Sequence, residues 1–398
     1  MIKLLTVIGA RPQIIKAAAI SRAIKECFFD RVEEKILHTG QHYDANMSQV
    51  FFDELGIPAP HYNLNVGSGI HGVQTAKMIE GIEQVLLSEK FDGIILYGDT
   101  NSTLAGAVAA SKLHIPIYHI EAGLRSFNMS MPEEVNRIVC DQLSTILFAP
   151  TQTAVDNLCL EGFNESKAVF ADGRMRRVIL SGDVMYDNSM YFASKAENES
   201  GILEEHGIEK NNFILVTIHR DNNTDNPKRL NDIFRALLYI SEQNSQQIVL
   251  PLHPRTKKML SINLKEDLQN KLLKSSIKII PPASFLDMIM LEKSATMVMT
   301  DSGGIQEEAP ALGKPVLVLR DTTERPEAVD AGTVKLIGTA YDDVLRETNL
   351  LLDDSAHYKK MAEAANPYGD GKACERIIRA ILQKNGYNVK ILSEFCSN

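Results

Sequence analysis

Short apolar runs rich in β-branched residues recur along the chain, each followed by a polar or glycine-containing turn and then by a helical pattern. The apolar runs are residues 4–9, 94–98, 117–120, 213–218, 248–252, 296–300 and 316–319. Continuous apolar runs of this length are typical of strands that helices cover on both faces. Strands that alternate with helices predict parallel sheets in an α/β fold.

Between these runs, apolar residues recur at the spacing of a helix. In the segment 74–87, Ile79, Ile82 and Leu86 fall on one face, and the segment 104–113 is rich in alanine. Pro12 follows the first run at a position that suits the first turn of a helix. We therefore expect helices at these three places.

The segment 193–212 separates two groups of predicted strands of similar size. It is rich in charged residues and asparagine, and Gly201 and Gly207 interrupt it. We expect a domain boundary between Tyr186 and Asn212, and therefore two α/β domains with a cleft between them. At 398 residues the chain is long enough to bury two cores.

Composition narrows the classes of partner. Asp and Glu total 51 against 42 for Lys and Arg, a net charge of −9, which argues against a general nucleic-acid or anionic-membrane binder. A local group of basic residues is still compatible with an anionic small molecule.

The five cysteines are dispersed and form no C-x-x-C pair, which predicts reduced thiols in a cytoplasmic protein. No apolar stretch approaches the roughly 20 residues that span a bilayer, so we expect no membrane segment.

Charged or hydroxyl-bearing residues follow most of the predicted strands. These residues are Arg11, Asp99, Glu121, His219, Arg220, His253, Asp301, Ser302, Arg320 and Asp321. Ligands of parallel sheets bind outside the carboxyl ends of the strands, so we expect a polar site there. Single positions also have structural explanations: Asp99 and its neighbours suit a helix N-cap, and His219 or His253 suits a hydrogen-bonded structural histidine.

The segment DSGGIQEE at 301–308 is the most specific local signal. Gly303 and Gly304 follow a predicted strand and let the backbone approach an anion closely, and the next helix would point its free N–H groups at that anion. Ser302 adds a hydroxyl, and Glu308 is placed to accept hydrogen bonds from sugar hydroxyls. A ribose beside a phosphate fits this arrangement.

Several enzyme classes are excluded by motifs that the chain lacks. No G-x-G-x-x-G follows the first strand and there is no G-x-x-x-x-G-K-[ST], which argues against a nicotinamide dehydrogenase and a P-loop NTPase. There is no G-x-S-x-G elbow of a serine hydrolase. No histidine, cysteine and carboxylate cluster has the spacing of metal ligands, so we expect neither a metal nor a cofactor.

Ordered motifs run along nearly the whole chain and carry a family resemblance. They are GARPQIIK at 9–16, GDTNST at 98–103, HIEAGLR at 119–125, PEEVNR at 132–137, HR at 219–220, TDSGGIQEEAP at 300–310, RDTTERPE at 320–327 and NPYGDG at 366–371. In these motifs the chain resembles the bacterial non-hydrolysing UDP-N-acetylglucosamine 2-epimerases.

The resemblance implies a GT-B-type architecture, in which two Rossmann-like domains face a central cleft. It implies that residues 1–188 form an N-terminal domain with the catalytic carboxylates and that residues 189–367 form the nucleotide-binding domain. Residues 368–398 would form a C-terminal helix that crosses back to the N-terminal domain. The implied assembly is a homodimer.

The implied reaction is the reversible conversion of UDP-GlcNAc to UDP-ManNAc, which supplies surface polysaccharide precursors. The family's route is anti elimination of UDP to a 2-acetamidoglucal, then reprotonation of C2 on the other face and re-addition of UDP. The C2 proton is not beside a carbonyl, so the departing diphosphate requires strong stabilisation as the C1–O bond breaks. Because the proton leaves one face and returns to the other, separate carboxylates suit the roles of base and acid.

The resemblance implies catalytic roles for Asp99, Glu121, Glu133 and His219. Which carboxylate is base and which is acid stays open. Glu134 lies beside Glu133, but we explain it as an acidic residue that favours a helix N-terminus. His219 would contact the diphosphate.

The resemblance also implies a set of residues that bind UDP or the sugar. They are Arg11, Lys16, His253, Ser302, Gly303, Gly304, Glu308 and Arg325. Arg11 would contact the diphosphate, Lys16 would support the Arg11 turn or the sugar, and Glu308 would bind the ribose. Gln41 and His42 match a regulatory UDP-GlcNAc site found in many bacterial members, although Asp44 departs from that pattern.

Alternatives remain for the nucleotide sugar that is the substrate and for the functional class of the protein. The segments HTGQHYDANMS at 38–48 and LRSFNMSMP at 124–132 are similar to the subgroup that acts on UDP-2,3-diacetamido-2,3-dideoxyglucuronic acid, whereas 300–327 is similar to the ordinary UDP-GlcNAc enzymes. A GT-B glycosyltransferase would share the nucleotide half, and so would a non-catalytic sugar-nucleotide sensor. Neither of these needs three carboxylates at a reacting centre.

Overall fold

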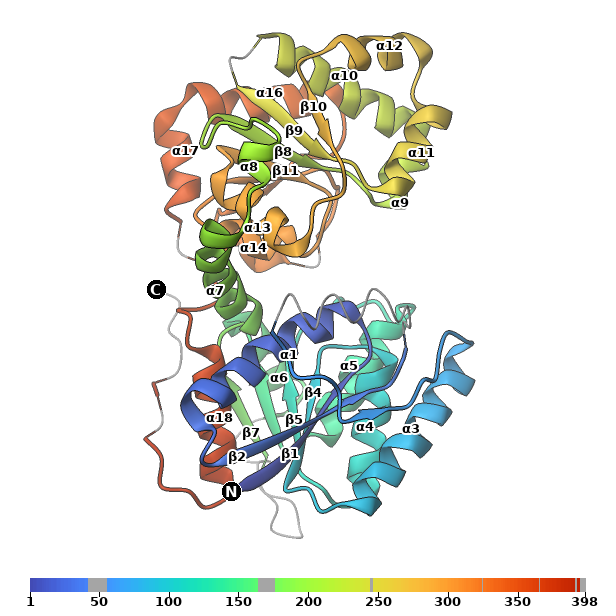
Figure 1. Cartoon of the computed structure of the whole chain (residues 1–398), viewed down its shortest axis with the longest axis vertical. Helices are drawn as coiled ribbons and strands as arrows, with labels where there is room; N and C mark the ends of the chain where they lie inside the picture. The colour runs from blue at the N-terminus through green and yellow to red at the C-terminus, as the bar shows by residue number, and fades with distance from the viewer. Residues whose placement is uncertain are drawn as a thin grey trace. The chain divides into compact units, whose positions relative to one another are not determined.

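The structure is a computed structural model that describes residues 1–41, 56–163, 176–243, 246–323, 325–364, 366–390 and 392–393. The chain divides into two compact units, shown in Figure 1. The first unit comprises Met1–Asn188 and Tyr368–Ser397, and the second comprises Ser189–Pro367. Each unit contains one sheet of parallel strands with helices around it, which confirms the α/β fold class.

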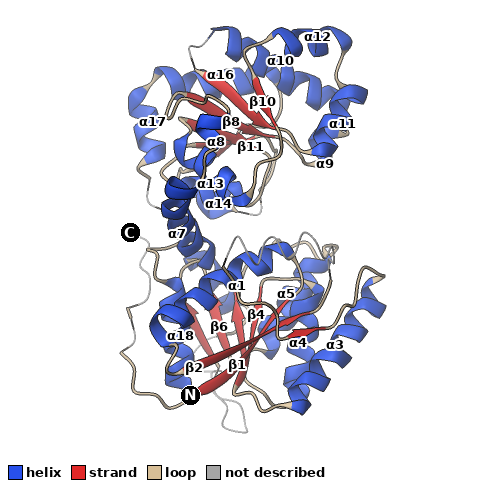
Figure 2. Ribbon diagram, in the orientation of Figure 1, coloured by secondary structure: helices blue, strands red, loops and turns tan. Residues whose placement is uncertain are grey.

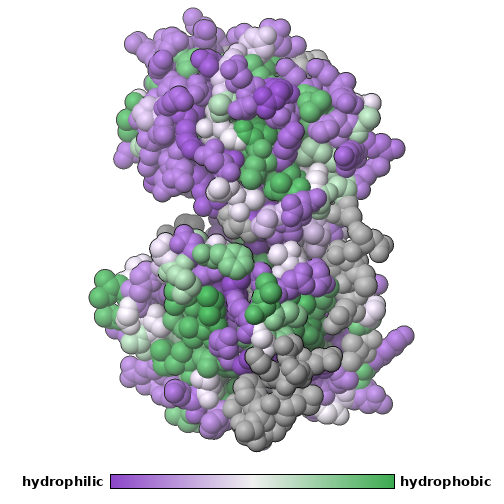
Figure 3. Space-filling view, turned by 180° about the vertical axis from the view of Figure 1, so that it is seen from behind, coloured by the Kyte–Doolittle hydropathy of each residue, from purple (hydrophilic) through white to green (hydrophobic). Residues whose placement is uncertain are grey.

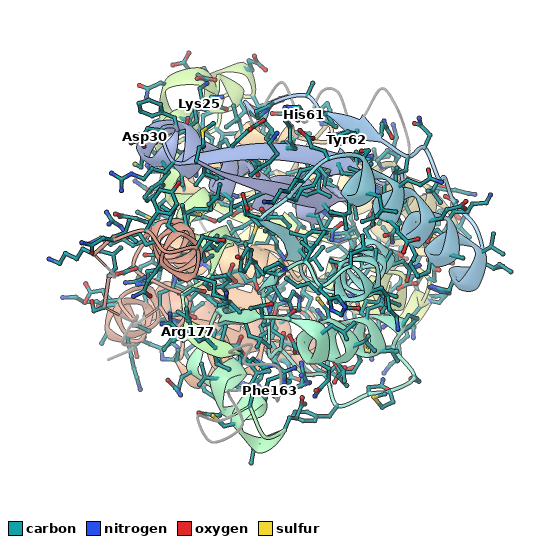
Figure 4. All side chains as sticks on the ribbon, turned by 90° about the horizontal axis from the view of Figure 1, so that it is seen from below. Lys25, Asp30, His61, Tyr62, Phe163 and Arg177 are labelled. Carbon is teal, nitrogen blue, oxygen red and sulfur yellow. The ribbon has the colours of Figure 1, made fainter. Side chains whose placement is uncertain are left out.

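The first unit is built on a seven-stranded sheet in the order β3-β2-β1-β4-β5-β6-β7. Its strands are β1 (Ile2–Ile8), β2 (Val32–His38), β3 (Tyr62–Asn63), β4 (Gly93–Tyr97), β5 (Ile117–Ile120), β6 (Ile146–Ala149) and β7 (Arg177–Leu180). Its helices are α1 (Arg11–Ala23) with the π-turn η1 (Ile24–Phe28), α3 (His71–Ser88), α4 (Asn101–Lys112), α5 (Pro132–Leu143), α6 (Gln152–Leu160) and α18 (Ala373–Lys384). Figure 4 shows both edges of this sheet, with Tyr62 of β3 at one edge and Arg177 of β7 at the other.

The hydrophobic pattern explains how this unit packs. Leu4 and Leu5 of β1 are fully buried, as expected for a strand covered on both faces. Helix α3 turns Ile82 and Leu86 into the core, as its spacing predicts, and Ile79 packs against that core as a partly buried residue. Helices α3, α4 and α5 pack side by side, while α1 packs against α18 (Figure 2).

The second unit is built on a six-stranded sheet in the order β10-β9-β8-β11-β12-β13. Its strands are β8 (Phe213–Thr217), β9 (Gln247–Pro251), β10 (Lys278–Ile280), β11 (Met297–Thr300), β12 (Val316–Val318) and β13 (Val334–Leu336). Its helices are α8 (Ile202–Glu205), α9 (Asp221–Thr224), α10 (Pro227–Gln243), α11 (Pro254–Asn263), α12 (Glu266–Lys274), α13 (Phe285–Ser294), α14 (Ile305–Ala311), α15 (Pro326–Asp330), α16 (Tyr341–Asp353) and α17 (Ser355–Ala362). Helix α7 (Val184–Glu199) contains the boundary between the units, at Asn188 and Ser189.

In both sheets the strand order reverses beside the first strand of the unit. Strand β1 lies between β2 and β4, and β8 lies between β9 and β11. The loops that follow these adjacent strands run in opposite directions, and such a divergence leaves a crevice at the carboxyl edge of the sheet. The candidate residues Asp99, His219 and Ser302 lie in these loops, and Arg11 is the first residue of α1.

The surface of the first unit carries hydrophobic patches between hydrophilic residues, as the rear view in Figure 3 shows. Its large exposed hydrophobic residues include Ile70, Phe127, Met129 and Leu160, which come from separate segments of the chain. Within the part of the chain that the structure describes, no helix is both long and apolar enough to cross a bilayer.

Candidate functional site

In the first unit, Gln13 holds the turn between β1 and α1. Its Oε1 accepts hydrogen bonds from the N–H of Gly9 (2.9 Å) and of Ala10 (3.2 Å), and its Nε2 donates to the carbonyl of Tyr97 (2.9 Å) and to Thr103 Oγ1 (3.0 Å). The turn that carries exposed Arg11 is thereby tied to the ends of β4 and α4. Gln13 was not singled out in the sequence, although it lies inside the first motif.

Gly9 is required by close packing at the same turn. A Cβ added there would lie 2.1 Å from Ser102 Oγ and 2.2 Å from Thr39 Oγ1. These distances are far below van der Waals contact, so a side chain at position 9 would displace the loop that carries Arg11.

The carboxylate of Glu121 lies where the ends of β1, β4 and β5 meet. It forms an ion pair with Lys16 of α1, and both side chains are largely buried. Glu121 has a φ of +72°, a left-handed conformation that is costly for a residue with a Cβ and that often marks a functional position. A Cβ added to Gly98 would lie 3.0 Å from Glu121 Oε2, so a side chain at position 98 would displace this carboxylate.

A fully buried charge pair supports the loop around Glu121. His119 bonds through Nδ1 to Asp141 Oδ1 (2.7 Å) and through Nε2 to the carbonyl of Gly98 (2.8 Å). Because both ring nitrogens face acceptors, the ring donates from both and is protonated. Burial opposes that charge, but neighbouring Cys140 and Asp141 raise the pKa of His119 well above its usual value. The histidine and arginine of the third motif therefore have structural partners that the sequence did not reveal.

Asp141 links this histidine to the arginine of the same motif. Its Oδ2 accepts from Arg125 Nη2 (2.8 Å) and from the N–H of Gly123 (3.2 Å), and Arg125 also pairs with Glu161 (2.6 Å). The segment that carries Glu121 is thus held by ionised groups on both sides.

The carboxylates of Asp99 and Glu134 share one guanidinium. Arg137 pairs with Asp99 through Nη2, and its Nη1 donates to Glu134 Oε2 (2.8 Å). Glu134 also accepts from the N–H groups of Ser126 and Phe127, both at 2.9 Å. Burial alone would raise the pKa of Glu134, but these backbone donors and Arg137 lower it below its usual value.

The neighbouring residue Glu133 has an exposed side chain and takes no part in that network. The structure therefore gives Glu134 a more specific role than the N-terminal electrostatic one expected for it, namely to organise the 126–127 loop and Arg137. A catalytic role for Glu133 continues to rest on the family resemblance.

Gln41, the candidate regulatory residue, holds the start of α4. Its Oε1 accepts from the N–H (3.1 Å) and the hydroxyl (2.8 Å) of Ser102. Its own carbonyl accepts from Gln74 (3.3 Å). The second regulatory candidate, His42, and the departing Asp44 lie outside the described residues.

In the second unit, Asp301 organises the ends of β8 and β11. This fully buried carboxylate accepts from the N–H groups of His219 (3.0 Å) and Arg220 (3.1 Å) and from Asn223 Nδ2 (3.1 Å). His219 Nδ1 lies 3.3 Å from Asp301 Oδ1, and its side chain is 42% exposed. Burial and the positive charges of Arg220 and His253 lower the pKa of His219, although Asp301 opposes them.

The turn at 302–304 is held by hydrogen bonds on both sides. The N–H of Ser302 donates to Thr300 Oγ1 (2.9 Å), and its carbonyl accepts from Gln306 Nε2 (2.9 Å). Gly304 is exposed and precedes α14, which has only seven residues. We therefore attribute any affinity of this turn for anions to its local N–H groups and to Ser302, rather than to the field of a long helix.

The remaining candidates of the second unit lie in different local environments. Glu308 lies partly buried on α14. Arg325 pairs with Glu307 at 2.5 Å, and both side chains are mostly buried. His253 caps α11, because its Nδ1 accepts from the N–H of Arg255 (3.2 Å). The structural explanation offered for His253 in the sequence thus matches a bond that the structure contains.

A pocket of about 350 Å³ opens at the carboxyl edge of the second sheet. It is lined by Arg220, Asn222, Asn223, Asn226, Arg229, Arg320, Asp321 and Thr322. Arg229 pairs with Asp321 at 2.5 Å. Three guanidinium groups against one carboxylate give the lining an excess of positive charge that suits a phosphate or a carboxylate. Among the described residues, no group of three or more His, Cys, Asp or Glu side chains has a metal-binding arrangement.

Comparisons with known proteins agree on one family. A family model described as UDP-N-acetylglucosamine 2-epimerase matches residues 25–382. A Pseudomonas aeruginosa UDP-2,3-diacetamido-2,3-dideoxy-D-glucuronate 2-epimerase is 47% identical over 94% of this chain and 98% of its own length. A UDP-N-acetylglucosamine 2-epimerase of Methanocaldococcus jannaschii is 42% identical over 95% of this chain and 98% of its own.

Solved structures give the same result. The Methanocaldococcus jannaschii UDP-GlcNAc 2-epimerase in complex with UDP-GlcNAc and UDP matches with a TM-score of 0.77 at 41% identity, covering 96% of this chain and 100% of that one. The Neisseria meningitidis enzyme bound to UDP-GlcNAc matches with a TM-score of 0.80 at 33% identity, covering 96% of this chain and 100% of that one. This similarity confirms the GT-B-type α/β fold that the motifs imply.

Proposed function

The chain belongs to the UDP-N-acetylglucosamine 2-epimerase family, and on that premise we propose that it interconverts UDP-GlcNAc and UDP-ManNAc by inverting C2 of the sugar. The observation that carries the proposal is the pair of carboxylates at the strand ends of the first unit. Glu121 is paired with Lys16 and Asp99 with Arg137. Two carboxylates with separate cationic partners suit a reaction in which one group removes a proton and another returns it.

The proposed reaction begins with anti elimination. A carboxylate takes the C2 proton, the C2–H electron pair forms the C1–C2 double bond, and the C1–O bond breaks to release UDP. The product of this step is 2-acetamidoglucal. A carboxylic acid on the opposite face then protonates C2, and the diphosphate oxygen of UDP adds back to C1.

The departing diphosphate needs hydrogen-bond donors that are already in place. The backbone of Ser302, which leads into Gly303 and Gly304, is held by the Thr300 hydroxyl, and the ring of His219 is held by Asp301. Arg11 would supply positive charge from the first unit. Donors that are held before the reaction stabilise developing charge without the cost of reorganisation.

The remaining roles follow the family resemblance. Glu308 would bind the ribose, Lys16 would support the Arg11 turn or the sugar, and Glu133 would be a third proton-transfer group. His253 and Arg325 would border the nucleotide, and Gln41 with His42 would form a regulatory site. No cofactor or metal is part of this proposal. We also propose a homodimer that works in the cytoplasm and supplies precursors of a surface polysaccharide.

The test is product identification by NMR after the purified protein is incubated with UDP-GlcNAc. The proposal expects UDP-ManNAc, with the nucleotide still attached. Free ManNAc with UDP would point to hydrolysing chemistry instead, and transfer of the sugar only when an acceptor is added would point to a glycosyltransferase. Tight binding of UDP-GlcNAc without any conversion would favour the sensor.

A second candidate substrate is UDP-2,3-diacetamido-2,3-dideoxyglucuronic acid. The arginine-lined pocket favours it, because guanidinium groups bind carboxylates bidentately and this sugar carries one. The 47% identity to a relative named for that substrate also supports it. The ratio of kcat/KM for the two nucleotide sugars decides between them. If Arg229→Leu lowered kcat/KM for the uronate alone, the pocket would be assigned to its carboxylate.

A further inference from the structure

His119 of β5 is a buried histidine that the proposed reaction does not use. Its side chain and that of Asp141 are both 0% exposed. The ring bonds through Nδ1 to Asp141 Oδ1 (2.7 Å) and through Nε2 to the carbonyl of Gly98 (2.8 Å). Each of these acceptors requires an N–H, so the ring is an imidazolium. Burying a charged ring is costly, and a position built in this way requires a physical explanation.

The ring of His119 joins the two segments that carry the proposed proton-transfer groups. Gly98 directly precedes Asp99, and His119 lies two residues before Glu121. The N–H of Gly98 also donates to the carbonyl of Ile120 (3.0 Å). The ends of β4 and β5 are therefore connected both by the backbone and by the histidine side chain.

The carboxylate of Asp141 anchors the other side of the ring. Its Oδ2 accepts from Arg125 Nη2 (2.8 Å) and from the N–H of Gly123 (3.2 Å). Asp141 therefore keeps two donors when His119 is replaced, whereas the bond from His119 to Gly98 is lost. The effect of such a replacement should fall on the segment that leads into Asp99.

We propose that His119 is a positioning residue that fixes the spacing of Asp99 and Glu121, and that this spacing decides how often the 2-acetamidoglucal intermediate is inverted. The inference rests on the proposed function, because it assumes that the two carboxylates act on opposite faces of C2. Protonation of the intermediate by one carboxylate regenerates the starting sugar, and protonation by the other gives the C2 epimer. In both cases the diphosphate oxygen of UDP adds back to C1.

Exchange of the C2 proton and inversion at C2 place different demands on the site. Exchange requires only one carboxylate within reach of C2, because the group that removes the proton also returns it after contact with solvent. Inversion requires both carboxylates within reach of the same carbon atom. A change in the spacing of Asp99 and Glu121 should therefore slow inversion more than exchange.

The experiment measures both processes at early times by proton NMR in deuterated water, starting once from UDP-GlcNAc and once from UDP-ManNAc. Deuterium at C2 of the starting sugar reports exchange, and appearance of the other sugar reports inversion. The ratio of the two initial rates does not depend on the amount of folded enzyme. A loss of stability alone therefore leaves the ratio unchanged.

Two variants separate the two bonds of the ring. His119→Asn places its amide near the position of Nδ1 and loses the bond to Gly98, whereas the longer His119→Gln reaches the position of Nε2 and keeps that bond. Loss of a hydrogen bond from a charged group predicts that His119→Asn raises the ratio of exchange to inversion about tenfold from one of the two sugars. With His119→Gln the ratio should stay within about twofold of the wild type.

Tyr118→Phe is the matched control on the same strand. Successive side chains of a strand point to opposite faces of the sheet, and the variant loses only the hydroxyl that accepts from Asn385 Nδ2 (3.1 Å). It should leave the ratio of exchange to inversion at the wild-type value.

An unchanged ratio from both sugars in His119→Asn would overturn the inference, and so would an equal rise in Tyr118→Phe. If His119→Asn does not fold, His119→Gln decides, because a rise of about tenfold in that variant would show that the bond to Gly98 does not set the ratio. If the wild type neither exchanges nor inverts either sugar, the proposed function itself fails, which is a different result.

Discussion

Carboxylates stand at strand ends in both units, but they are satisfied in different ways. In the first unit, Glu121 and Asp99 are paired with the side chains of Lys16 and Arg137. In the second unit, Asp301 accepts hydrogen bonds from backbone N–H groups and an asparagine amide. A carboxylate opposite a flexible side chain can exchange its partner for a substrate proton, whereas one that binds the backbone fixes the shape of a loop. On this comparison we propose that the first unit transfers the proton and that the second unit binds the nucleotide.

The largest effect is expected when a carboxylate that is paired with a cationic side chain, as in the first unit, is neutralised. Glu121→Gln should lower kcat about 10²- to 10⁴-fold, because it removes a group that transfers a proton. The affinity for UDP should not change, because UDP is assigned to the second unit. Turnover measured by NMR and UDP binding measured by calorimetry test both statements. Glu89→Gln, a carboxylate paired with Lys3 away from the site, is the control. A variant that keeps its turnover would remove Glu121 from the mechanism.

Neutralising Asp301, the carboxylate that accepts backbone hydrogen bonds in the second unit, should weaken UDP binding. In Asp301→Asn, one oxygen is replaced by an NH₂ group that faces backbone donors, and each unsatisfied buried group costs about 1–3 kcal/mol. We expect UDP affinity to fall about 10- to 100-fold, together with a loss of stability. Calorimetry and thermal unfolding measure both. If kcat fell while UDP affinity stayed the same, the division of roles between the two units would be wrong.

The adjacent residues Glu133 and Glu134 allow an exposed carboxylate and a buried one to be compared within one helix, α5. Glu134→Gln should destabilise the first unit by about 1–3 kcal/mol, because two backbone N–H groups and Arg137 lose their charged acceptor. Glu133→Gln should leave stability unchanged and lower turnover if the residue transfers a proton. Chemical denaturation and steady-state rates separate the two variants. Equal effects of both would mean that the exposed and buried positions do not differ in role.

Because the pKa of Glu134 is lowered, the stability that this residue contributes depends on pH. A carboxyl group whose folded pKa is lowered adds stability above its ordinary value of 4.5, and that stability is lost as the pH falls through the folded pKa. The stability difference between the wild type and Glu134→Gln should therefore shrink on acidification below about pH 4.5. A difference that stayed constant down to pH 2 would contradict the ionised state of Glu134.

The smallest effect is expected at Gly98. Gly98→Ala places a Cβ 3.0 Å from Glu121 Oε2 at a φ of +59°, which predicts a loss of stability of about 1 kcal/mol or more. The turnover rate should fall by more than this loss of stability alone would explain, because the added Cβ displaces the Glu121 carboxylate. Gly56→Ala, at a φ of +65° with no atom near its Cβ, matches the backbone strain without that contact. If both variants had equal turnover, the contact with Glu121 would not matter.

The sequence predicts the parts of the fold that depend on apolar continuity. Every apolar run singled out in the sequence forms a strand, and 4–9, for example, corresponds to β1 at Ile2–Ile8. Strands β2, β3, β6, β7, β10 and β13 were not singled out in the sequence. Strand β2 carries Glu33, Glu34 and Lys35, and the others have only two to four residues each. Period and hydrophobicity are weak signals for strands this short or charged.

The sequence predicts the residues of the candidate site that lie in motifs or directly after strands, but not their contacts. Position after a strand indicates Asp99, Glu121 and Asp301, but not which partner each one meets. His119 and Asp141 are 22 positions apart in sequence, and the pair forms only through packing. Glu292 lies near the end of α13, next to Lys293, and no local pattern shows that its carboxyl group is buried without a partner among the described residues. Long-range contacts of this kind require the structure.

The most direct test of proton transfer at C2 is proton NMR of the purified protein with UDP-GlcNAc in deuterated water. The proposal predicts that UDP-ManNAc appears and that deuterium enters C2 of both nucleotide sugars, since C2 is reprotonated by a group that has exchanged with solvent. UDP-ManNAc that forms while the C2 proton is retained would contradict removal and return of the proton by separate, solvent-exchanged carboxylates.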